Sequence, residues 1–442
     1  MMPYAARRAD VLARMQPGAV AVLGTAPEVL RNGDSDYPYR HDSHFYYLSG
    51  FAEPESFLVL AAAQGERAAR SILFCREKHV EREIWEGFRF GPEAARREFG
   101  VDEAYPIDEL DARMADILAD APSLYYALGS PLDTRVALWL KAVRARGRSG
   151  VTAPQATHHL LGILDEMRLL KDAHEIALMA RAGVISGQAH ARAMRATRPG
   201  MFEYELEAEL LHEFRRNGAQ FPAYPSIVAS GANACVLHYS ANNRRIADGD
   251  LVLIDAGCEF DGYAADITRT WPANGRFSDA QRTLYELVLR AQAAAIAAVN
   301  PGRPYGAIHD AAVRVLTEGM LDLGLLDADK VGTLDEAVAS RAYAQFYMHG
   351  TGHWLGMDVH DVGAYRDVAV PDKPSRPLLP GMALTVEPGI YVRPAEGVPE
   401  RFWDIGIRIE DDVVVTDTGC RILTGDAPKD VADIEALMGG TR

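Results

Sequence analysis

Three histidines lie close together between residues 349 and 361, as histidines do in many catalytic and metal sites. They are His349, His353 and His360. Imidazole is the commonest neutral metal ligand and titrates near pH 7, so this cluster predicts chemistry beyond packing. Glycines interrupt the same stretch, which disfavours a helix and favours close approach of the backbone to a ligand. Gly350 stands where the helical zinc motif H-E-x-x-H needs its glutamate, which counts against a zincin site.

Two carboxylates flank a predicted hairpin turn within residues 251–271, LVLIDAGCEFDGYAADITRTW. Asp261-Gly262 is the turn signal, and Asp255 and Asp266 lie on either side of it. On antiparallel strands we expect these two acids nearly opposite one another, where they repel unless a cation lies between them. The alternative is that both point to solvent or cap turns. It is disfavoured because Asp255 ends an apolar run, where burying a carboxylate is costly.

Two later segments also place an acid at the end of an apolar strand. Glu387 follows the run MALTV and precedes a proline, which holds the residue before it extended. In residues 404–410, DIGIRIE, the strand alternation puts Arg408 and Glu410 on one face. Either glutamate alone would be interpreted as a surface residue or an ion-pair partner. Four acids at strand ends, beside a glycine-flanked histidine, are harder to explain in that way.

This donor set predicts a metal centre. Oxygen-rich ligands with one imidazole suit Mn²⁺, Co²⁺ or Zn²⁺, and the pattern contains no thiolate. Four carboxylate charges balance two divalent cations, so we expect two ions roughly 3.5–4 Å apart with a water or hydroxide held between them. Such a site predicts hydrolysis, in which one ion polarises a carbonyl or phosphoryl oxygen.

The elements that must position these residues belong to the second part of the chain. Helices are expected over residues 165–197, from a capping box at Ser278 and Gln281 to a stop at Pro301-Gly302, and over residues 305–323. They alternate with segments of hairpin character. An α+β region with an antiparallel sheet covered by helices is therefore predicted.

The first part of the chain has a different organisation. Short apolar runs alternate with amphipathic ones, which is typical of an α/β domain. Residues 32–51, NGDSDYPYRHDSHFYYLSGF, have few aliphatic side chains and are predicted to be a long ordered loop at an interface or a site. Residues 145–154, ARGRSGVTAP, mark a linker. The predicted domains are residues 1–165 and 166–442.

The composition limits the partners and the location. A formal net charge of −16 over 442 residues disfavours binding to nucleic acid or to an anionic membrane. No stretch is long enough to span a bilayer, and the N-terminus lacks a signal-peptide core. The four cysteines are scattered without a C-x-x-C, so neither a disulfide framework nor a structural zinc site is predicted. The expected location is the cytoplasm.

Five separated motifs resemble the metallopeptidases of the pita-bread fold and, within them, the Xaa-Pro aminopeptidase (aminopeptidase P) family. The motifs are IDAG at Asp255, DITRT at Asp266, HGTGHWLGMDVHD at residues 349–361, VEPG at Glu387 and RIED at Glu410. YPYRHDSHFYYLSGF is similar to part of that family's N-terminal domain, and LHY at residues 237–239 to part of its catalytic domain. The resemblance implies an α/β N-terminal domain followed by an α+β catalytic domain of pita-bread fold.

The resemblance also implies a role for each candidate residue. The ligands of two divalent ions would be Asp255, Asp266, His353, Glu387 and Glu410, of which Asp266 and Glu410 would bridge the ions. Mn²⁺ is the expected metal, and Co²⁺ and Zn²⁺ are also compatible. Glu387 would orient the bridging hydroxide and act as general acid/base, a role worth about 10²–10⁴ in rate. The substrate and the tetrahedral intermediate would be contacted by His238, His349 and His360, with Arg408 as a further catalytic residue and Tyr391 as a substrate-binding residue.

The activity that the resemblance implies is hydrolysis of the bond between an N-terminal residue and a following proline. This bond is a tertiary amide without an N–H. A pocket fitted to the proline ring, with His360 at its edge, would accept peptides of this kind. The N-terminal domain is expected to narrow the entrance of the cleft and to mediate homo-oligomers, either dimers or tetramers.

Other functions stay open on the sequence alone. A prolidase, which cleaves only Xaa-Pro dipeptides, has the same five ligands, although the YPYR segment favours the aminopeptidase. A creatinase-like hydrolase shares the fold but not the ligand set. A non-catalytic pita-bread binding module would have lost its ligands. A dehydrogenase or another nucleotide enzyme is not supported, because no G-x-G-x-x-G or P-loop lies between a strand and a helix.

Overall fold

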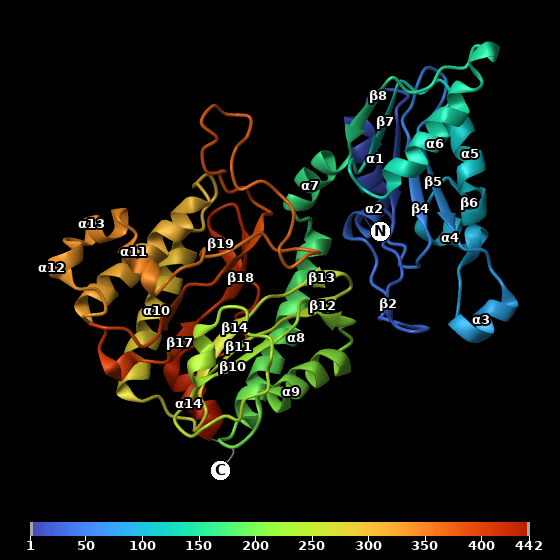
Figure 1. Cartoon of the computed structure of the whole chain (residues 1–442). Helices are drawn as coiled ribbons and strands as arrows, with labels where there is room; N and C mark the ends of the chain where they lie inside the picture. Colours follow the sequence, from blue (N-terminus) through green and yellow to red (C-terminus); the bar gives the residue numbers. More distant parts are fainter. Residues whose placement is uncertain (1–2, 440–442) are drawn as a thin grey trace. The chain divides into compact units, whose positions relative to one another are not determined.

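The computed structural model describes residues 3–439. The chain divides between Arg168 and Leu169 into two compact units, each with its own sheets and its own hydrophobic core (Figure 1). Among the described residues, no helix has the length and apolar character that crossing a membrane requires.

The first unit is an α/β domain, as predicted. Its mixed six-stranded sheet has the order β6-β5-β4-β1-β7-β8, with β1 antiparallel to β4 and parallel to β7. The strands of this sheet are β1 (Val20–Gly24), β4 (Phe57–Ala61), β5 (Arg70–Cys75), β6 (Glu103–Pro106), β7 (Ser123–Tyr126) and β8 (Ala156–His159). The helices are α1 (Tyr4–Arg14), α2 (Ser43–Ser49), α3 (Val80–Glu86), α4 (Gly91–Phe99), α5 (Leu110–Ile117), α6 (Leu132–Arg144) and α7 (Leu161–Leu169).

The segment predicted as a long ordered loop is partly regular. Its start forms a short hairpin of β2 (Leu30–Asn32) and β3 (Ser35–Asp36), and its end contains helix α2. Asp42 caps α2 by accepting a hydrogen bond of 2.8 Å from the backbone N–H of Phe45. The prediction was wrong for this helix because the aromatic residues taken as lining a site, such as Phe45 and Tyr47, are buried core side chains.

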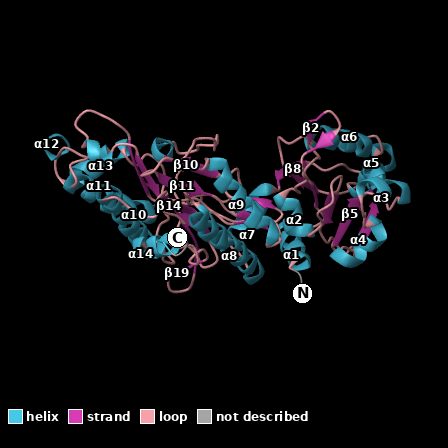
Figure 2. Cartoon of the chain, turned by 90° about the horizontal axis from the view of Figure 1, so that it is seen from below, coloured by secondary structure: helices cyan, strands magenta, loops and turns pink. Residues whose placement is uncertain are grey.

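The second unit consists of antiparallel sheets between two pairs of helices. Figures 1 and 2 show α8 and α9 on one side of the strands, and α10 and α11 on the other. The strand orders are β10-β11-β14, β13-β12-β9, β15-β18-β19 and β16-β17. The strands are β9 (Phe221–Pro222), β10 (Ile227–Ser230), β11 (Leu251–Asp255), β12 (Cys258–Phe260), β13 (Tyr263–Ala264), β14 (Thr268–Pro272), β15 (Ala383–Val386), β16 (Gly389–Val392), β17 (Ile405–Arg408), β18 (Asp411–Val415) and β19 (Cys420–Ile422).

The helices of this unit test the predicted boundaries. They are α8 (Ala173–Ala196), α9 (Glu203–Arg216), α10 (Asp279–Ala298), α11 (Gly306–Asp322), α12 (Ala328–Val331), α13 (Leu334–Ala339) and α14 (Val431–Gly439). The capping box at Ser278 is confirmed and opens α10. The single helix predicted over residues 165–197 is wrong, because Asp172 accepts hydrogen bonds from two backbone N–H groups of the first turn and starts α8 afresh. The periodic residues behind the prediction, Ile176 to Gly183, all follow Asp172, so they do not fix where the helix begins.

Strands from the two ends of the second unit lie side by side. The yellow-green strands β11 and β14 contact the red strand β17 (Figure 1). Ile254 on β11 and Ile407 on β17 are fully buried in one core, which also contains residues of α8, α9, α10 and α11. This packing brings the ends of β11 and β17 together, and the predicted acids lie at those ends.

Candidate active site

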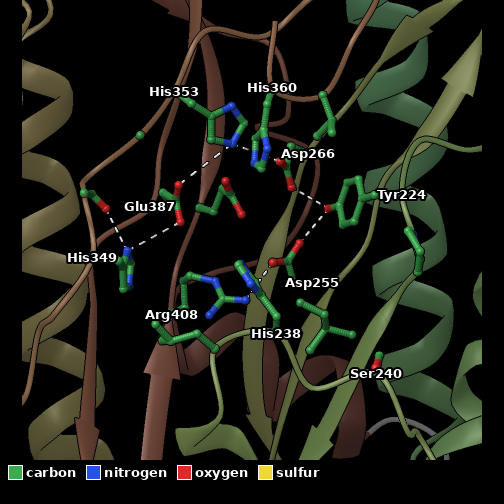
Figure 3. Close-up of a pocket in the computed structure, with 17 residues that line it drawn as sticks. Tyr224, His238, Ser240, Asp255, Asp266, His349, His353, His360, Glu387 and Arg408 are labelled. Atoms are coloured by element: carbon green, nitrogen blue, oxygen red, sulfur yellow. Dashed lines mark hydrogen bonds and ion pairs between the residues drawn. The ribbon is translucent and has the colours of Figure 1, made fainter.

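A cavity of about 520 Å³ in the second unit collects the predicted residues (Figure 3). Its walls contain four acids, four histidines and one arginine of the prediction, namely Asp255, Asp266, Glu387, Glu410, His238, His349, His353, His360 and Arg408. Tyr391, predicted to bind substrate, is not among the residues that line the cavity. It is buried behind the wall and reaches the wall residues through its hydroxyl.

Strand ends place the acids at this cavity. Asp255 is the last residue of β11, Glu387 directly follows β15, and Glu410 lies between β17 and β18. The predicted opposition of Asp255 and Asp266 is wrong in register. Asp255 pairs with Thr268, and Asp266 lies in the connection before β14. The two acids nevertheless meet, because this connection turns Asp266 towards the end of β11 (Figure 3).

The histidine-rich stretch is an irregular loop, as its glycines predict. Its backbone follows β15: the N–H of Thr385 donates to the carbonyl of His353 at 3.0 Å, and the N–H of Glu387 donates to the carbonyl of Thr351 at 2.8 Å. A Cβ at Gly352 would overlap the carbonyl oxygen of Thr385. Only glycine therefore permits the close approach that sets His353 beside Glu387.

Tyr224 joins the first two acids. Its hydroxyl lies 2.6 Å from Oδ1 of Asp255 and also within hydrogen-bonding distance of Oδ1 of Asp266. A tyrosine hydroxyl has one proton to donate, so it satisfies only one of these oxygens. The other carboxylate needs a further proton or a cation.

Arg408 supplies a fixed positive charge at one side of the cavity. Its Nη2 donates to Oδ2 of Asp255 at 2.6 Å, its Nη1 donates to the Tyr391 hydroxyl at 3.0 Å, and its Nε donates to Oγ1 of Thr268 at 3.0 Å. Thr268 in turn donates to Oε2 of Glu410 at 2.6 Å. One buried guanidinium therefore fixes the positions of Asp255, Tyr391 and, through Thr268, Glu410.

The ring of His353 presents one nitrogen to the acids. Nδ1 donates to the carbonyl of Trp354 at 3.0 Å, which leaves Nε2 facing Oδ2 of Asp266 at 3.4 Å and Oε1 of Glu387 at 3.9 Å. Burial opposes protonation of this ring, but Asp266 and Glu387 outweigh burial and raise the pKa of His353 to about 9. Nε2 has the orientation of a metal ligand whose other nitrogen is held by the backbone.

The other histidines differ in environment. His349 is held between the carbonyl of Gly350, 2.7 Å from Nδ1, and the Tyr391 hydroxyl, 2.8 Å from Nε2. Burial and then the charge of Arg408 lower the pKa of His349 to about 3, so its imidazole is neutral near pH 7. His360 sets its ring at 81° to that of His353, with the centroids 4.3 Å apart. Both His360 and His238 are exposed at the cavity.

The acids fit a bound cation by their charge and by their donor atoms. Burial raises the pKa of Glu387 to about 7, and burial together with the neighbouring acids raises the pKa of Glu410. Asp266, His353 and Glu410 offer three ligand atoms within 4.8 Å of one another. Several ionised carboxylates at such distances are stable only with a compensating positive charge. The residues present therefore form a possible metal-binding site.

Sequence reasoning missed Tyr224 and the part played by Thr268. Tyr224 has no motif of its own, and only the register of β10, in which Ile227 pairs with Asp255, brings it to the acids. Thr268 stands inside the DITRT motif, two residues after Asp266. The sequence shows a hydroxyl residue near Asp266, but it does not show the hydrogen bond to Glu410, which lies 142 positions away in the chain.

Paired helices over antiparallel sheets (Figure 1), with four acids and four histidines in a shared cavity, are the features of a metal-dependent hydrolase. Residues 177–417 match Metallopeptidase family M24, and residues 4–125 match Aminopeptidase P, N-terminal domain. The chain is 46% identical to the Xaa-Pro aminopeptidase of Escherichia coli (strain K12), over 99% of this chain and 97% of that protein. It is 36% identical to Xaa-Pro aminopeptidase 3 of Homo sapiens, over 98% of this chain and 85% of that protein.

Solved structures agree with these matches. The aminopeptidase PepP of Pseudomonas aeruginosa superposes with a TM-score of 0.95 at 49% identity, covering 99% of this chain and 98% of that one. Zinc-substituted aminopeptidase P of Escherichia coli in complex with product gives a TM-score of 0.94 at 45% identity, over 99% and 98%. The chain belongs to the aminopeptidase P family of M24 metallopeptidases. The predicted pita-bread fold and the predicted family are thereby confirmed.

Proposed function

We propose that this chain is an Xaa-Pro aminopeptidase, which hydrolyses the bond between the N-terminal residue of a peptide and a proline at the second position. One observation carries the proposal. Four acids and His353, which come from separate segments between residues 255 and 410, surround one cavity in a chain that is similar over its whole length to enzymes of that name. The substrates are peptides with proline second.

We infer that two divalent ions occupy the cavity, with Asp255, Asp266, His353, Glu387 and Glu410 as ligands. Mn²⁺ is the proposed native metal, and Co²⁺ and Zn²⁺ suit the same donors. The zinc-substituted relative from Escherichia coli supports a site that tolerates more than one metal. When bound, the ions lower the pKa of water and polarise the scissile carbonyl.

Glu387 is the proposed general base and acid. Its carboxylate lies within 3.9 Å of His353 and on the same wall as His349, so it borders the space where the scissile carbon must lie. It takes the proton from the attacking water and delivers it to the proline nitrogen. That transfer is required because the proline nitrogen must leave as a neutral amine and not as its anion.

The histidines His238, His349 and His360, together with Arg408, are proposed to hold the substrate. Burial and the charge of Arg408 keep His349 neutral, and Tyr391 orients its ring. The Tyr391 hydroxyl accepts from Arg408 and donates to Nε2 of His349. His238 and His360 face the cavity from two other segments. Apolar lining residues, Ile227, Leu237 and Val359, offer a surface for the proline ring.

The remaining expectations are also proposals. We propose domains of residues 1–165 and 166–442, with the first restricting access to the site and mediating a dimer or tetramer. The four cysteines are free thiols, which supports a reducing compartment such as the cytoplasm. Light scattering of the purified chain measures the oligomeric state: a mass of one chain would contradict the proposed oligomer.

Substrate specificity is tested with an Xaa-Pro-Pro tripeptide beside the corresponding Xaa-Pro dipeptide and a tripeptide with alanine second. The proposed function predicts release of the first amino acid from the Xaa-Pro-Pro tripeptide and no release from the alanine peptide. Cleavage of the dipeptide alone would make the chain a prolidase. If none of the three peptides is cleaved with any of the candidate metals, the chain would be a non-catalytic binding module.

A further inference from the structure

His238 reaches the cavity from a segment without helix or strand. It follows the short turn η3 (Gly231–Cys235) and precedes β11, and residues 236–250 have no regular structure. Among residues 3–439, no hydrogen bond to the His238 imidazole is formed, and the side chain is exposed at the cavity (Figure 3). The position of this imidazole therefore depends on what holds its backbone.

Glu203 contacts four residues in or beside that segment, namely Ser230, Asn233, Tyr239 and Arg244. It is the first residue of α9, it is fully buried, and it does not line the cavity. Oε1 accepts from the N–H and the hydroxyl of Ser230, each at 2.7 Å, before the segment begins. Oε2 accepts from the Tyr239 hydroxyl at 2.7 Å, directly beside His238, and from the N–H of Arg244 at 2.8 Å, where the segment ends.

Among residues 3–439, the carboxylate of Glu203 is met by these donors and forms no ion pair. Arg244, whose backbone N–H contacts Glu203, turns its Nη1 to the hydroxyl of Ser230 at 2.8 Å and to Asp250 at 2.7 Å. Burying a carboxylate costs free energy that an apolar side chain would avoid. When both oxygens of a buried carboxylate accept directed hydrogen bonds, the carboxylate has one favourable orientation. The groups that donate to it are then held in fixed positions around it.

We propose that Glu203 is a positioning residue for His238 and acts through Tyr239. The carboxylate fixes both ends of residues 231–244, and the Tyr239 hydroxyl fixes the residue next to the imidazole. This inference rests on the proposed function, because it requires His238 to meet the substrate. Its consequence is that a hydroxyl outside the metal site contributes to turnover by keeping His238 in place.

Two variants weaken the contact between Glu203 and Tyr239, one from each side. Tyr239→Phe removes one hydroxyl, and Glu203→Gln keeps the shape of the side chain but loses one acceptor oxygen. We expect kcat/KM for the tripeptide to fall roughly tenfold or more in each, since charge-assisted hydrogen bonds and correct placement carry effects of this size. Tyr204→Phe, an exposed tyrosine on α9, and Glu209→Gln, in a half-exposed ion pair with Arg192, are matched controls expected within twofold of wild type.

A double-mutant cycle separates positioning from general damage. In a His238→Ala background, Tyr239→Phe should cause no further loss of kcat/KM, whereas a purely structural role would lower the rate again by the same factor. Hydrogen exchange of the metal-free protein gives a readout without activity: Glu203→Gln should speed exchange of the amides of residues 230–244 and leave those of α10 unchanged.

The outcomes are separable. A wild-type protein that leaves the tripeptide intact, with metal supplied, contradicts the proposed function itself. A wild-type protein that cleaves it, combined with full activity in Tyr239→Phe or with equal losses in both backgrounds, overturns the role of Glu203 alone. Loss confined to the background that retains His238, together with faster exchange of residues 230–244, supports it.

Discussion

Nη2 of Arg408 lies 2.6 Å from Oδ2 of Asp255, although the two residues are 153 positions apart in the chain. The contact exists because β11 and β17 share one core and end at the same cavity. The same guanidinium also donates to Tyr391 and Thr268. Three donors in a fixed plane are a property of arginine that lysine lacks.

Arg408→Lys tests whether this geometry matters to the reaction. A lysine keeps the charge but cannot contact all three partners, so we expect kcat/KM to fall about 100-fold with the metal still bound. Arg393→Lys is the control, because within residues 3–439 Arg393 donates only to the carbonyl of Cys235. Peptide kinetics and metal analysis of both variants decide the matter; activity within twofold of wild type in Arg408→Lys would contradict the assigned role.

Tyr224→Phe tests the link between the two aspartates. Removing the hydroxyl removes the group that contacts both Asp255 and Asp266, while Asp255 keeps its contact with Arg408. We expect the affinity for Mn²⁺ to weaken about 10–100-fold, which is typical when a partner of metal ligands is lost. Calorimetric titration of the metal-free protein measures this, with Tyr204→Phe as the control. An unchanged dissociation constant would show that Tyr224 does not organise the ligands.

Local patterns in the sequence were sufficient for part of the site. Glu387 and Glu410 were found because each follows an apolar strand, and the loop at residues 349–361 because glycines interrupt it. Such signals lie within a few residues of the functional group. The assignment of His353 as a ligand, and of its neighbours as substrate contacts, came from family resemblance, because spacing alone does not distinguish them.

Strand register was only partly predicted. Asp255 was expected opposite Asp266 but pairs with Thr268, because the turn at Asp261-Gly262 pairs Phe260 with Tyr263 and the same register continues to Asp255 and Thr268. Tyr224 joins the acids only because β10 pairs with β11. In the first unit, helix α2 was missed because its aromatic side chains were assigned to a loop at a site instead of to the core.

A buried ion pair makes a prediction about stability. Nζ of Lys171 lies 2.8 Å from Oδ2 of Asp361, and both side chains are 1% exposed. Asp361 directly follows His360, so the ion pair holds the C-terminal end of the histidine-rich loop, residues 349–361, in place. Lys171→Met removes the cation that faces the buried Asp361 carboxylate and should lower the free energy of unfolding by about 3–5 kcal/mol.

Chemical denaturation of three variants checks this prediction. The double variant Lys171→Met/Asp361→Leu should lose less stability than Lys171→Met, because both buried charges are then removed together. Arg314→Met, which breaks an exposed ion pair with Asp335, should cost about 1 kcal/mol or less. Equal small losses in Lys171→Met and Arg314→Met would contradict a stabilising role for the buried pair.

A buried histidine predicts a pH dependence of stability. Nε2 of His190 donates to the carbonyl of Ala256 at 2.9 Å, and burial lowers the pKa of His190 to about 4. In the unfolded chain the pKa is about 6.5, so between pH 6.5 and 4 the unfolded state binds a proton that the folded state does not. Its contribution is present above pH 6.5 and is lost as the pH falls towards 4, by on the order of 3 kcal/mol.

His190→Gln isolates this contribution, because glutamine can still donate to Ala256 and does not titrate. Denaturation midpoints of both proteins are compared from pH 7.5 to pH 4. Wild type should lose stability relative to the variant throughout the lower part of this range. A difference between the two proteins that stays constant with pH would show that His190 is not responsible.

The most direct test of the central claim is a metal titration of activity. The protein is stripped with a chelator, dialysed, and assayed on an Xaa-Pro-Pro tripeptide while Mn²⁺ is added stepwise and the released first residue is measured. The account predicts no release from the stripped protein and recovery that saturates as the site at Asp255, Asp266, His353, Glu387 and Glu410 fills, with none in Glu387→Ala or His353→Ala. Full activity in the stripped protein, or in either variant, would contradict it.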